Sequence, residues 1–242
     1  ENGAGKSTLM TIIYGIYTAS AGDLLVNETE VKIRSVEDAI KLRMGMVHQE
    51  FMLIPRFTVT QNIVIGDEPH KGIFFDYSRA VREVRELSES VSLTVDATAL
   101  VSDLPVGVQQ RVEILKVLRR GAEILIFDEP TAVLTPEETV DLFVTMRKLQ
   151  AEGKTILFIS HKLKEVMEIA DRIAVLRRGK LQGIVNKKDT NEEELARMMV
   201  GRNVVLEIPH VDVEVGAVAF ACHDLHVKNK RGYETVRDMS FD

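Results

Sequence analysis

The sequence predicts an α/β domain in which a mostly parallel sheet is flanked by helices. Short apolar runs alternate along the chain with amphipathic stretches of helical spacing, and crossover connections between parallel strands produce that order. Residues 124–127 are all apolar and lack the alternation of a half-exposed strand, so we expect a central strand covered on both faces. The 242 residues, of which 45% are hydrophobic, suffice for one domain with a full core.

The other elements follow from hydrophobic spacing. Apolar residues three and four positions apart predict helices at residues 7–17, 78–91, 109–118, 136–152, 164–170 and 192–200. Apolar or alternating runs predict further strands at residues 23–33, 44–48, 155–160 and 172–176. Asn27 and Glu28 interrupt the first of these runs, which predicts a break there. Thr135 and Pro136 are typical of a helix start, and Gly153 is typical of a helix end.

The pattern changes at about residue 209. Beyond it we expect short strands at 218–222 and 223–227 and a turn at 229–232. The predicted domain therefore covers residues 1–208, and residues 209–242 form a linker and the beginning of another unit.

Composition excludes several function classes. The net charge of −6 gives no overall attraction for nucleic acid or an anionic membrane surface, so no nucleic-acid partner is expected. Cys222 is the only cysteine, which rules out an internal disulfide and fits a reducing compartment. No apolar run reaches the roughly 18 to 20 residues that span a bilayer. Any membrane role must therefore come through a partner.

The first eight residues, from Glu1 to Thr8, contain most of a phosphate-binding loop. They match G-x-x-x-x-G-K-[ST] except for its first glycine, which we expect before Glu1 together with the first strand. In such a loop, successive backbone N–H groups and the positive end of the following helix face phosphate oxygens. The loop residues are Asn2, Gly3, Ala4 and Gly5. Lys6 is expected to contact the β and γ phosphates, Ser7 a magnesium ion, and Thr8 a further phosphate oxygen; an incidental glycine-rich cap is the alternative.

Two carboxylates, Asp128 and Glu129, follow the predicted central strand. Ligands bind at this edge of a parallel sheet, where Asp128 can hold magnesium and Glu129 can polarise an attacking water. Alone, such a pair is more often a helix cap or a solvated turn. His161 follows another strand and can bond the γ phosphate or the water. The remaining histidines lack the spacing of a metal site and are interpreted as structural: His48, His70, His210, His223 and His226.

Taken in order, these motifs resemble those of ABC-transporter ATPases, which have the P-loop NTPase fold with a helical subdomain, here at about 70–120, and a small β part. Residues 46–51 are similar to the family's glutamine loop, so the resemblance implies that Gln49 contacts magnesium or the attacking water. Residues 104–109 are similar to the family signature, which contacts ATP bound to the opposite domain. The signature positions are Leu104, Pro105, Val106, Gly107 and Gln109.

Two residues depart from the family pattern. Pro105 stands where serine is usual and offers neither a hydroxyl nor an N–H group, whereas the amide of Gly107 remains. Thr135 stands where many relatives have an aspartate. These changes leave open an ATP-gated regulatory module with little hydrolysis. A soluble ABC ATPase acting in DNA repair or translation is the other alternative.

Within the family, residues 45–49, 105–116 and 130–136 resemble ATPases of simple-sugar and nucleoside importers. Such proteins carry two nucleotide-binding domains in one chain, so residues 209–242 are expected to begin the second. The resemblance implies ATP and Mg²⁺ as ligands. It also implies two transmembrane permease subunits and, through them, a solute-binding protein as partners, at the cytoplasmic face of the plasma membrane.

Overall fold

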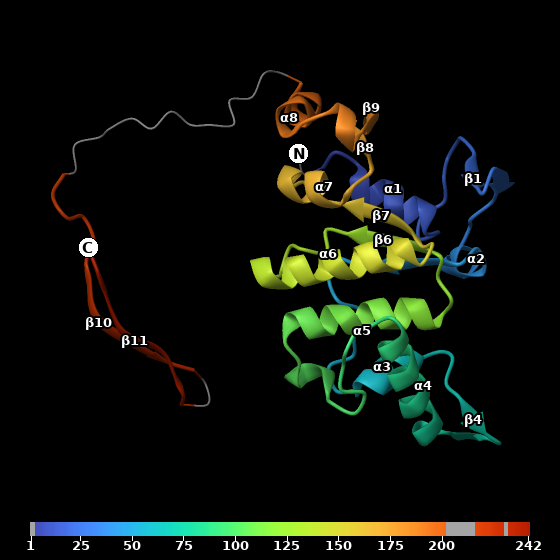
Figure 1. Ribbon diagram of the computed structural model, residues 1–242, viewed down its shortest axis with the longest axis horizontal. Helices are drawn as coiled ribbons and strands as arrows, with labels where there is room; N and C mark the ends of the chain where they lie inside the picture. The colour runs from blue at the N-terminus through green and yellow to red at the C-terminus, as the bar shows by residue number, and fades with distance from the viewer. Residues whose placement is uncertain (1–2, 202–215, 230–231) are drawn as a thin grey trace. The chain divides into compact units, whose positions relative to one another are not determined.

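The computed structural model describes residues 3–201, 216–229 and 232–242 (Figure 1). The chain divides into two compact units, Glu1–Val204 and Val205–Asp242, which are described separately. In the described residues, no helix is both long and apolar enough to cross a membrane.

The first unit alternates helices and strands, as predicted. Its helices are α1 (Lys6–Ile13), α2 (Val36–Lys41), α3 (Val59–Val64), α4 (Tyr77–Ser90), α5 (Val106–Arg119), α6 (Pro136–Ala151), α7 (Leu163–Ile169) and α8 (Glu192–Val200), with 3₁₀ turns η1 (Val101–Asp103) and η2 (Lys187–Asp189). Its strands are β1 (Leu24–Val26), β2 (Thr29–Val31), β3 (Met44–Val47), β4 (His70–Lys71), β5 (Phe74–Phe75), β6 (Ile124–Asp128), β7 (Thr155–Ile159), β8 (Arg172–Arg177) and β9 (Lys180–Asn186).

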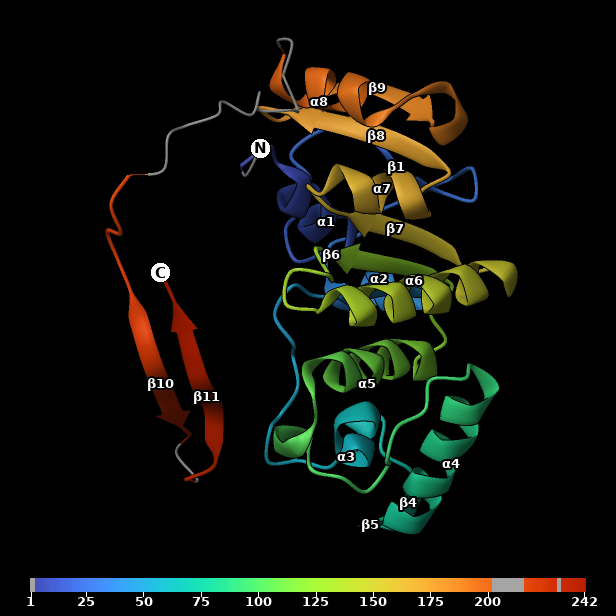
Figure 2. The ribbon, with the colours of Figure 1, turned by 60° about the vertical axis from the view of Figure 1, so that its left-hand side comes forward.

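A three-stranded parallel sheet, ordered β3-β6-β7, lies at the centre of this unit (Figure 2). Its register aligns Val47 with Phe127 and Phe127 with Phe158, so the three strands end at the same edge. Leu125 and Ile126 are fully buried, as is Phe127. The prediction of a central strand covered on both faces is confirmed.

Different helices cover the two faces of the sheet. On one face, Leu125 and Phe127 belong to a large apolar cluster that includes residues of α3, α4, α5 and α6. On the other face, Ile126 packs with residues of β3, α1 and α2. A third cluster joins β8 to α7 and α8. The sheet is thus held between two layers of helices, with its carboxyl edge left for ligands.

Several boundaries differ from the predictions. α1 ends at Ile13, because Gly15 turns the chain with φ of 80° where any Cβ would lie 2.3 Å from the Ser35 carbonyl oxygen. α5 begins at Val106, three residues before the predicted start. The strand predicted at 172–176 pairs antiparallel with the unpredicted β9 and forms its own two-stranded sheet. Asn27 and Glu28 form a left-handed turn between β1 and β2, as the break in the pattern predicts.

The second unit is a β-hairpin of β10 (Cys222–Lys228) and β11 (Glu234–Phe241). Two short strands at 218–222 and 223–227 were expected, but residues 218–221 are not in a strand, and one strand, β10, includes positions 222–228 although its register with β11 shifts between Cys222 and Leu225. The predicted turn is supported at Gly232, whose amide donates to the Asn229 carbonyl oxygen, while residues 230–231 lie outside the described part.

Candidate nucleotide-binding site

The glycine-rich loop leads directly into α1. Gly3 and Gly5 have φ angles of 78° and 91°, in the left-handed region that favours glycine. Gly5 is the N-cap of α1 and has no side chain to occupy the first-turn amides, and that turn carries no acidic residue. The loop is held by the amide of Gly179, which donates to the Ala4 carbonyl oxygen at 3.0 Å. The positive end of α1 can therefore receive an anion, while Asn2 lies outside the described residues.

The end of β6 contacts this helix through Ser7. The Ser7 hydroxyl donates to Oδ1 of Asp128 at 3.2 Å, although 121 positions separate the two residues. Burial raises the pKa of the Asp128 carboxyl, the hydrogen bond from Ser7 opposes this, and the charge of Glu129 adds to it. A hydroxyl and a carboxylate side by side are hard oxygen ligands of the kind that magnesium prefers.

Glu129 and His161 form the second polar pair, with 3.2 Å between Oε1 of Glu129 and Nδ1 of His161. Glu129 has φ of 47°, which is rare for a residue with a side chain and is found at functional sites. Its amide donates to the carbonyl oxygen of Ile159, the last residue of β7. The turn out of β6 is therefore fixed against the end of β7, and each strand contributes one member of the pair.

His48 and Gln49, the two residues that follow β3, lie at the same edge of the sheet. Gln49 is exposed there, whereas His48 is half-buried and was interpreted from sequence as structural. The His48 ring contacts Tyr14 edge-on, with 6.3 Å between centroids. Burial lowers the pKa of His48, the Asp128 carboxylate opposes this, and Lys116 adds to it. Its place directly after a buried strand, beside Gln49, was the signal that could have placed it near the site.

A network of hydrogen bonds around Glu165, which was not predicted from the sequence, lies near the Glu129–His161 pair. Oε2 of Glu165 accepts hydrogen bonds from the hydroxyls of Thr131, at 2.6 Å, and Ser160, at 3.1 Å. Oε1 of Glu165 pairs with Nζ of Lys162 at 2.9 Å. These contacts join the segment after β6 to the segment after β7. They keep the two strand ends together, which the separate motifs in the sequence could not reveal.

The predicted signature residues lie at the start of α5 and contact a different part of the chain. Pro105 is the N-cap of α5, and the side-chain amide of Gln109 donates to the Leu104 carbonyl oxygen at 3.0 Å. Val106 is 38% exposed, and the amide of Gly107 donates to Glu138 of α6. Within the described part of the chain, these hydrogen bonds are thus local or to α6, while the Leu104 side chain packs against the large apolar cluster.

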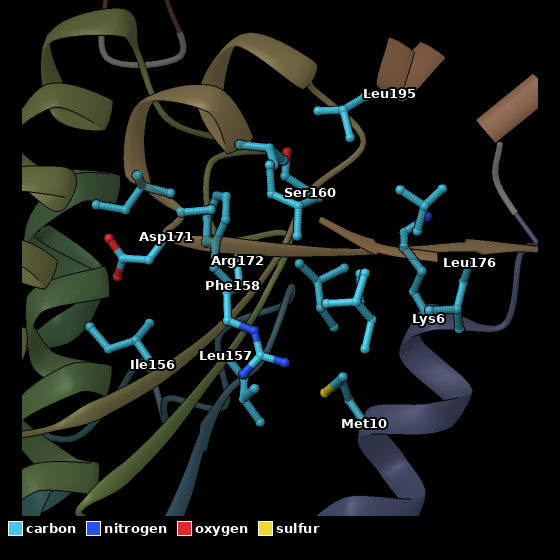
Figure 3. Close-up of a pocket in the computed structure, with 18 of the residues that line it drawn as sticks. Lys6, Met10, Ile156, Leu157, Phe158, Ser160, Asp171, Arg172, Leu176 and Leu195 are labelled. Atoms are coloured by element: carbon cyan, nitrogen blue, oxygen red, sulfur yellow. The ribbon is translucent and has the colours of Figure 1, made fainter. Parts of the chain in front are cut away.

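A cavity of about 670 Å³ lies between β7, β8 and α1 (Figure 3). Its lining includes all of β7 and most of β8, together with Lys6 and Met10 of α1. Asp128, Glu129 and His161 do not contribute to it within the described chain. Because its walls are mainly apolar and include two strands that do not pair with each other, it differs in character from the polar site.

Comparison with known proteins identifies the family. The profile described as "ABC transporter" matches residues 1–132, which is more than half of the chain. The chain belongs to the ABC transporter family. The match includes the glycine-rich loop, the predicted signature, and the Asp128–Glu129 pair.

Relatives from several organisms match at least 99% of the chain's length. The chain is 48% identical to "Nucleoside import ATP-binding protein NupA" of Lactococcus lactis subsp. cremoris, over 100% of this chain and 48% of that protein. It is 49% identical to "Guanosine import ATP-binding protein NupO" of Bacillus subtilis, over 99% of this chain and 47% of that protein. "Ribose import ATP-binding protein RbsA" of Clostridium tetani is 40% identical, over 100% and 47%. The chain thus spans about half the length of these curated relatives.

Solved structures share the fold of this ABC transporter chain. The structure of cbiO1 from Clostridium perfringens, described as part of the ABC transporter complex cbiONQ, has a TM-score of 0.66 at 27% identity and covers 78% of this chain and 75% of its own. A nucleotide-free ATP-binding cassette from an ABC transporter has a TM-score of 0.69 at 22% identity, covering 84% and 82%. The predicted P-loop α/β fold is confirmed.

Proposed function

We propose that this chain is the ATP-binding and ATP-hydrolysing part of a subunit that powers an ABC importer of simple sugars or nucleosides. The observation that carries the proposal is the meeting of two polar pairs at one sheet edge: Ser7 with Asp128, and Glu129 with His161. The names of the relatives, which are import ATP-binding proteins for nucleosides and ribose, support the importer class.

The residues present fit magnesium and a triphosphate. The α1 N-terminus has a glycine cap and no acidic residue in its first turn, which suits an anion. Lys6 follows this cap and supplies a positive charge for the β and γ phosphates, with Thr8 on the same turn. Ser7 and Asp128 supply the oxygen ligands for Mg²⁺, and exposed Gln49 can complete them. A bound Mg²⁺ neutralises charge that develops on the phosphate oxygens.

Glu129 and His161 are assigned to the attacking water. A carboxylate there orients the water and accepts its proton, while the imidazole, held 3.2 Å from the carboxylate, bonds the water or the γ phosphate. The left-handed backbone at Glu129 turns the chain at the end of β6, and the hydrogen bonds of Glu165 join the segments that carry Glu129 and His161. Catalysis then comes mainly from positioning and from charge stabilisation, as in other phosphoryl transfers.

The signature is assigned to a second nucleotide, held by an opposite domain. Gly107 offers its amide at the N-terminus of α5, where the helix dipole favours an anion. Pro105 has no N–H group and Val106 no polar side chain, so this contact is weaker than a serine-containing signature provides. Leu104 and Gln109 hold the turn through their mutual hydrogen bond.

We assign residues 1–208 to one nucleotide-binding domain, with its helical subdomain at about 70–120, and residues 209–242 to a linker and the start of a second. The relatives' length, about twice that of the chain, supports a second domain. The apolar cavity between β7 and β8 supports a further strand in the first domain. Among the described strands, β7 pairs only with β6 and β8 only with β9, so a further strand can pair with their remaining edges.

An exposed apolar cluster supports the permease partner. Met52, Ile54, Phe57 and Leu100 are each at least 36% exposed. Backbone contacts bring three of them together, because the Phe57 amide donates to the Ile54 carbonyl oxygen and Thr58, next to Phe57, bridges to Leu100. Exposed apolar groups gathered on one surface are typical of a protein contact. We therefore infer peripheral attachment, through two permease subunits, to the cytoplasmic face of the plasma membrane, with the solute-binding protein reached through them.

The test is ATP hydrolysis by the full-length subunit, assembled with its permease in vesicles, with and without Lys6→Ala. We expect transport-linked hydrolysis in the unchanged protein and a loss of at least about 100-fold in the variant, because a point charge on the transferred phosphate is removed. Tight ATP binding without turnover in the unchanged protein would instead favour the ATP-gated regulatory module.

A further inference from the structure

One carboxylate, that of Glu138, lies at the N-terminal ends of two helices. Oε2 accepts from the Thr135 amide at 3.0 Å and so completes the capping box of α6. Oε1 accepts from the Gly107 amide, also at 3.0 Å, at the start of α5. The same side chain therefore connects the signature turn with the segment that precedes α6.

The start of α5 lacks the usual means of satisfying its amides. Its N-cap, Pro105, makes no side-chain hydrogen bond, and its first turn contains no acidic residue. Glu138 supplies the missing acceptor and a negative charge from another helix. The contact depends on glycine at position 107, since a Cβ there would lie 2.6 Å from Oε1 of Glu138.

Other contacts hold α5 in place without Glu138. The side-chain amide of Gln110 donates to the Pro130 carbonyl oxygen at 2.8 Å, in a buried setting. One helical turn beyond Gly107, Arg111 pairs with Asp141 of α6 at 3.1 Å. The contacts of Gln110 and Arg111 thus hold α5 in place, and the Gly107 amide can change its acceptor without releasing the helix.

We propose that Glu138 is a positioning residue that occupies the Gly107 amide until a triphosphate held by the opposite domain displaces it. The inference rests on the proposed function, which assigns that amide to a γ phosphate. One N–H group cannot serve two anionic acceptors at full strength, and the two anions repel each other. Closure of the domains therefore exchanges carboxylate for phosphate, and reopening restores the carboxylate. The charge of Glu138 raises the ATP concentration needed for closure.

The experiment compares Glu138→Gln with Glu137→Gln in the full-length subunit assembled with its permease, by the dependence of hydrolysis on ATP concentration. Glu137 lies in the same turn of α6 and is exposed, so its replacement removes the same charge from the same helix end. Glutamine at position 138 keeps the shape and a neutral acceptor. We expect KM for ATP to fall about fivefold in Glu138→Gln with no rise in kcat, and to stay unchanged in Glu137→Gln.

Two further variants separate the possible failures. Glu138→Asp keeps the charge but is too short to reach both amides, and KM should lie between the other values; it also serves if Glu138→Gln does not fold. An unchanged or raised KM in both Glu138 variants overturns the proposal and leaves Glu138 as a helix cap. If KM is unchanged or raised in both Glu138 variants while Lys6→Ala abolishes hydrolysis, the proposed function stands and this inference falls. Absence of hydrolysis in the unchanged protein removes both.

Discussion

β6 and β7 are neighbours in one parallel sheet with similar apolar sequences, but they are covered differently. β6 pairs on both edges, and Leu125, Ile126 and Phe127 are fully buried. β7 pairs with β6 alone among the described strands, and Ile156, Leu157 and Phe158 are only half-buried. Its other edge faces the apolar cavity in Figure 3. The comparison shows that an apolar sequence predicts a buried strand but does not specify which neighbouring elements cover it.

Although β6 and β7 differ in burial, the polar residues that follow them contact each other. Glu129 at the end of β6 and His161 beyond β7 are paired, and the Glu129 amide bonds to the last residue of β7. The hydrogen bonds to Glu165 reinforce this junction from behind. The geometry of the site therefore depends on the ends of the strands and the loops that follow them. The unpaired edge of β7 affects the burial of its apolar side chains instead.

The largest expected effect is at the polar end of β6. Glu129→Gln in the full-length subunit should lower ATP turnover by about 10²- to 10⁴-fold, because the amide cannot accept the proton of the attacking water. ATP binding should persist, since Lys6 and Ser7 are unchanged, and both quantities are measured on the same preparation. Glu152→Gln, an exposed charge at the end of α6, is the control. Turnover near that of the control would remove Glu129 from its assigned role.

The covered and open strands can be compared directly through Phe127 and Phe158, which are paired in the sheet register. Phe127→Ala should cost about 3–5 kcal/mol of the free energy of unfolding, because a fully buried ring leaves a cavity. Phe158→Ala should cost about 2 kcal/mol, because its ring is only partly buried where it packs against Phe143 and the large apolar cluster. Urea unfolding of residues 1–242 measures both.

A longer version of the protein tests the cause of that difference. If an added upstream strand fills the cavity beside β7, the cost of Phe158→Ala should rise toward that of Phe127→Ala. Equal costs in residues 1–242 would mean that the open edge has no energetic consequence.

The smallest effect concerns the pH dependence of stability at Asp128. Burial raises the pKa of this carboxyl above its unfolded value, so its ionisation destabilises the folded chain as pH rises through the folded pKa. Asp128→Asn should therefore raise Tm by about 2 °C at pH 7, in the absence of metal and nucleotide, and have little effect below pH of about 3.8. The amide oxygen can still accept from Ser7. An equal shift in Tm at both pH values would exclude ionisation as the cause.

Sequence reasoning located most of the helices and the central strands, because their patterns are local and periodic. It also selected the four residues that the structure brings together in pairs, Ser7 with Asp128 and Glu129 with His161. It missed Glu165 and Glu138, since each acts through partners far along the chain. His48 was interpreted as structural, although burial and the carboxylate of Asp128 both influence its pKa.

By itself, the sequence determined the order of α and β elements, the phosphate-binding loop and the carboxylates at the end of an apolar strand, because spacing and backbone requirements are local properties. Only the tertiary structure decided which side chains meet, such as Glu138 with the Gly107 amide, and which strand edge stays open. Those outcomes depend on how elements tens of residues apart are placed relative to one another. A local sequence pattern does not contain that information.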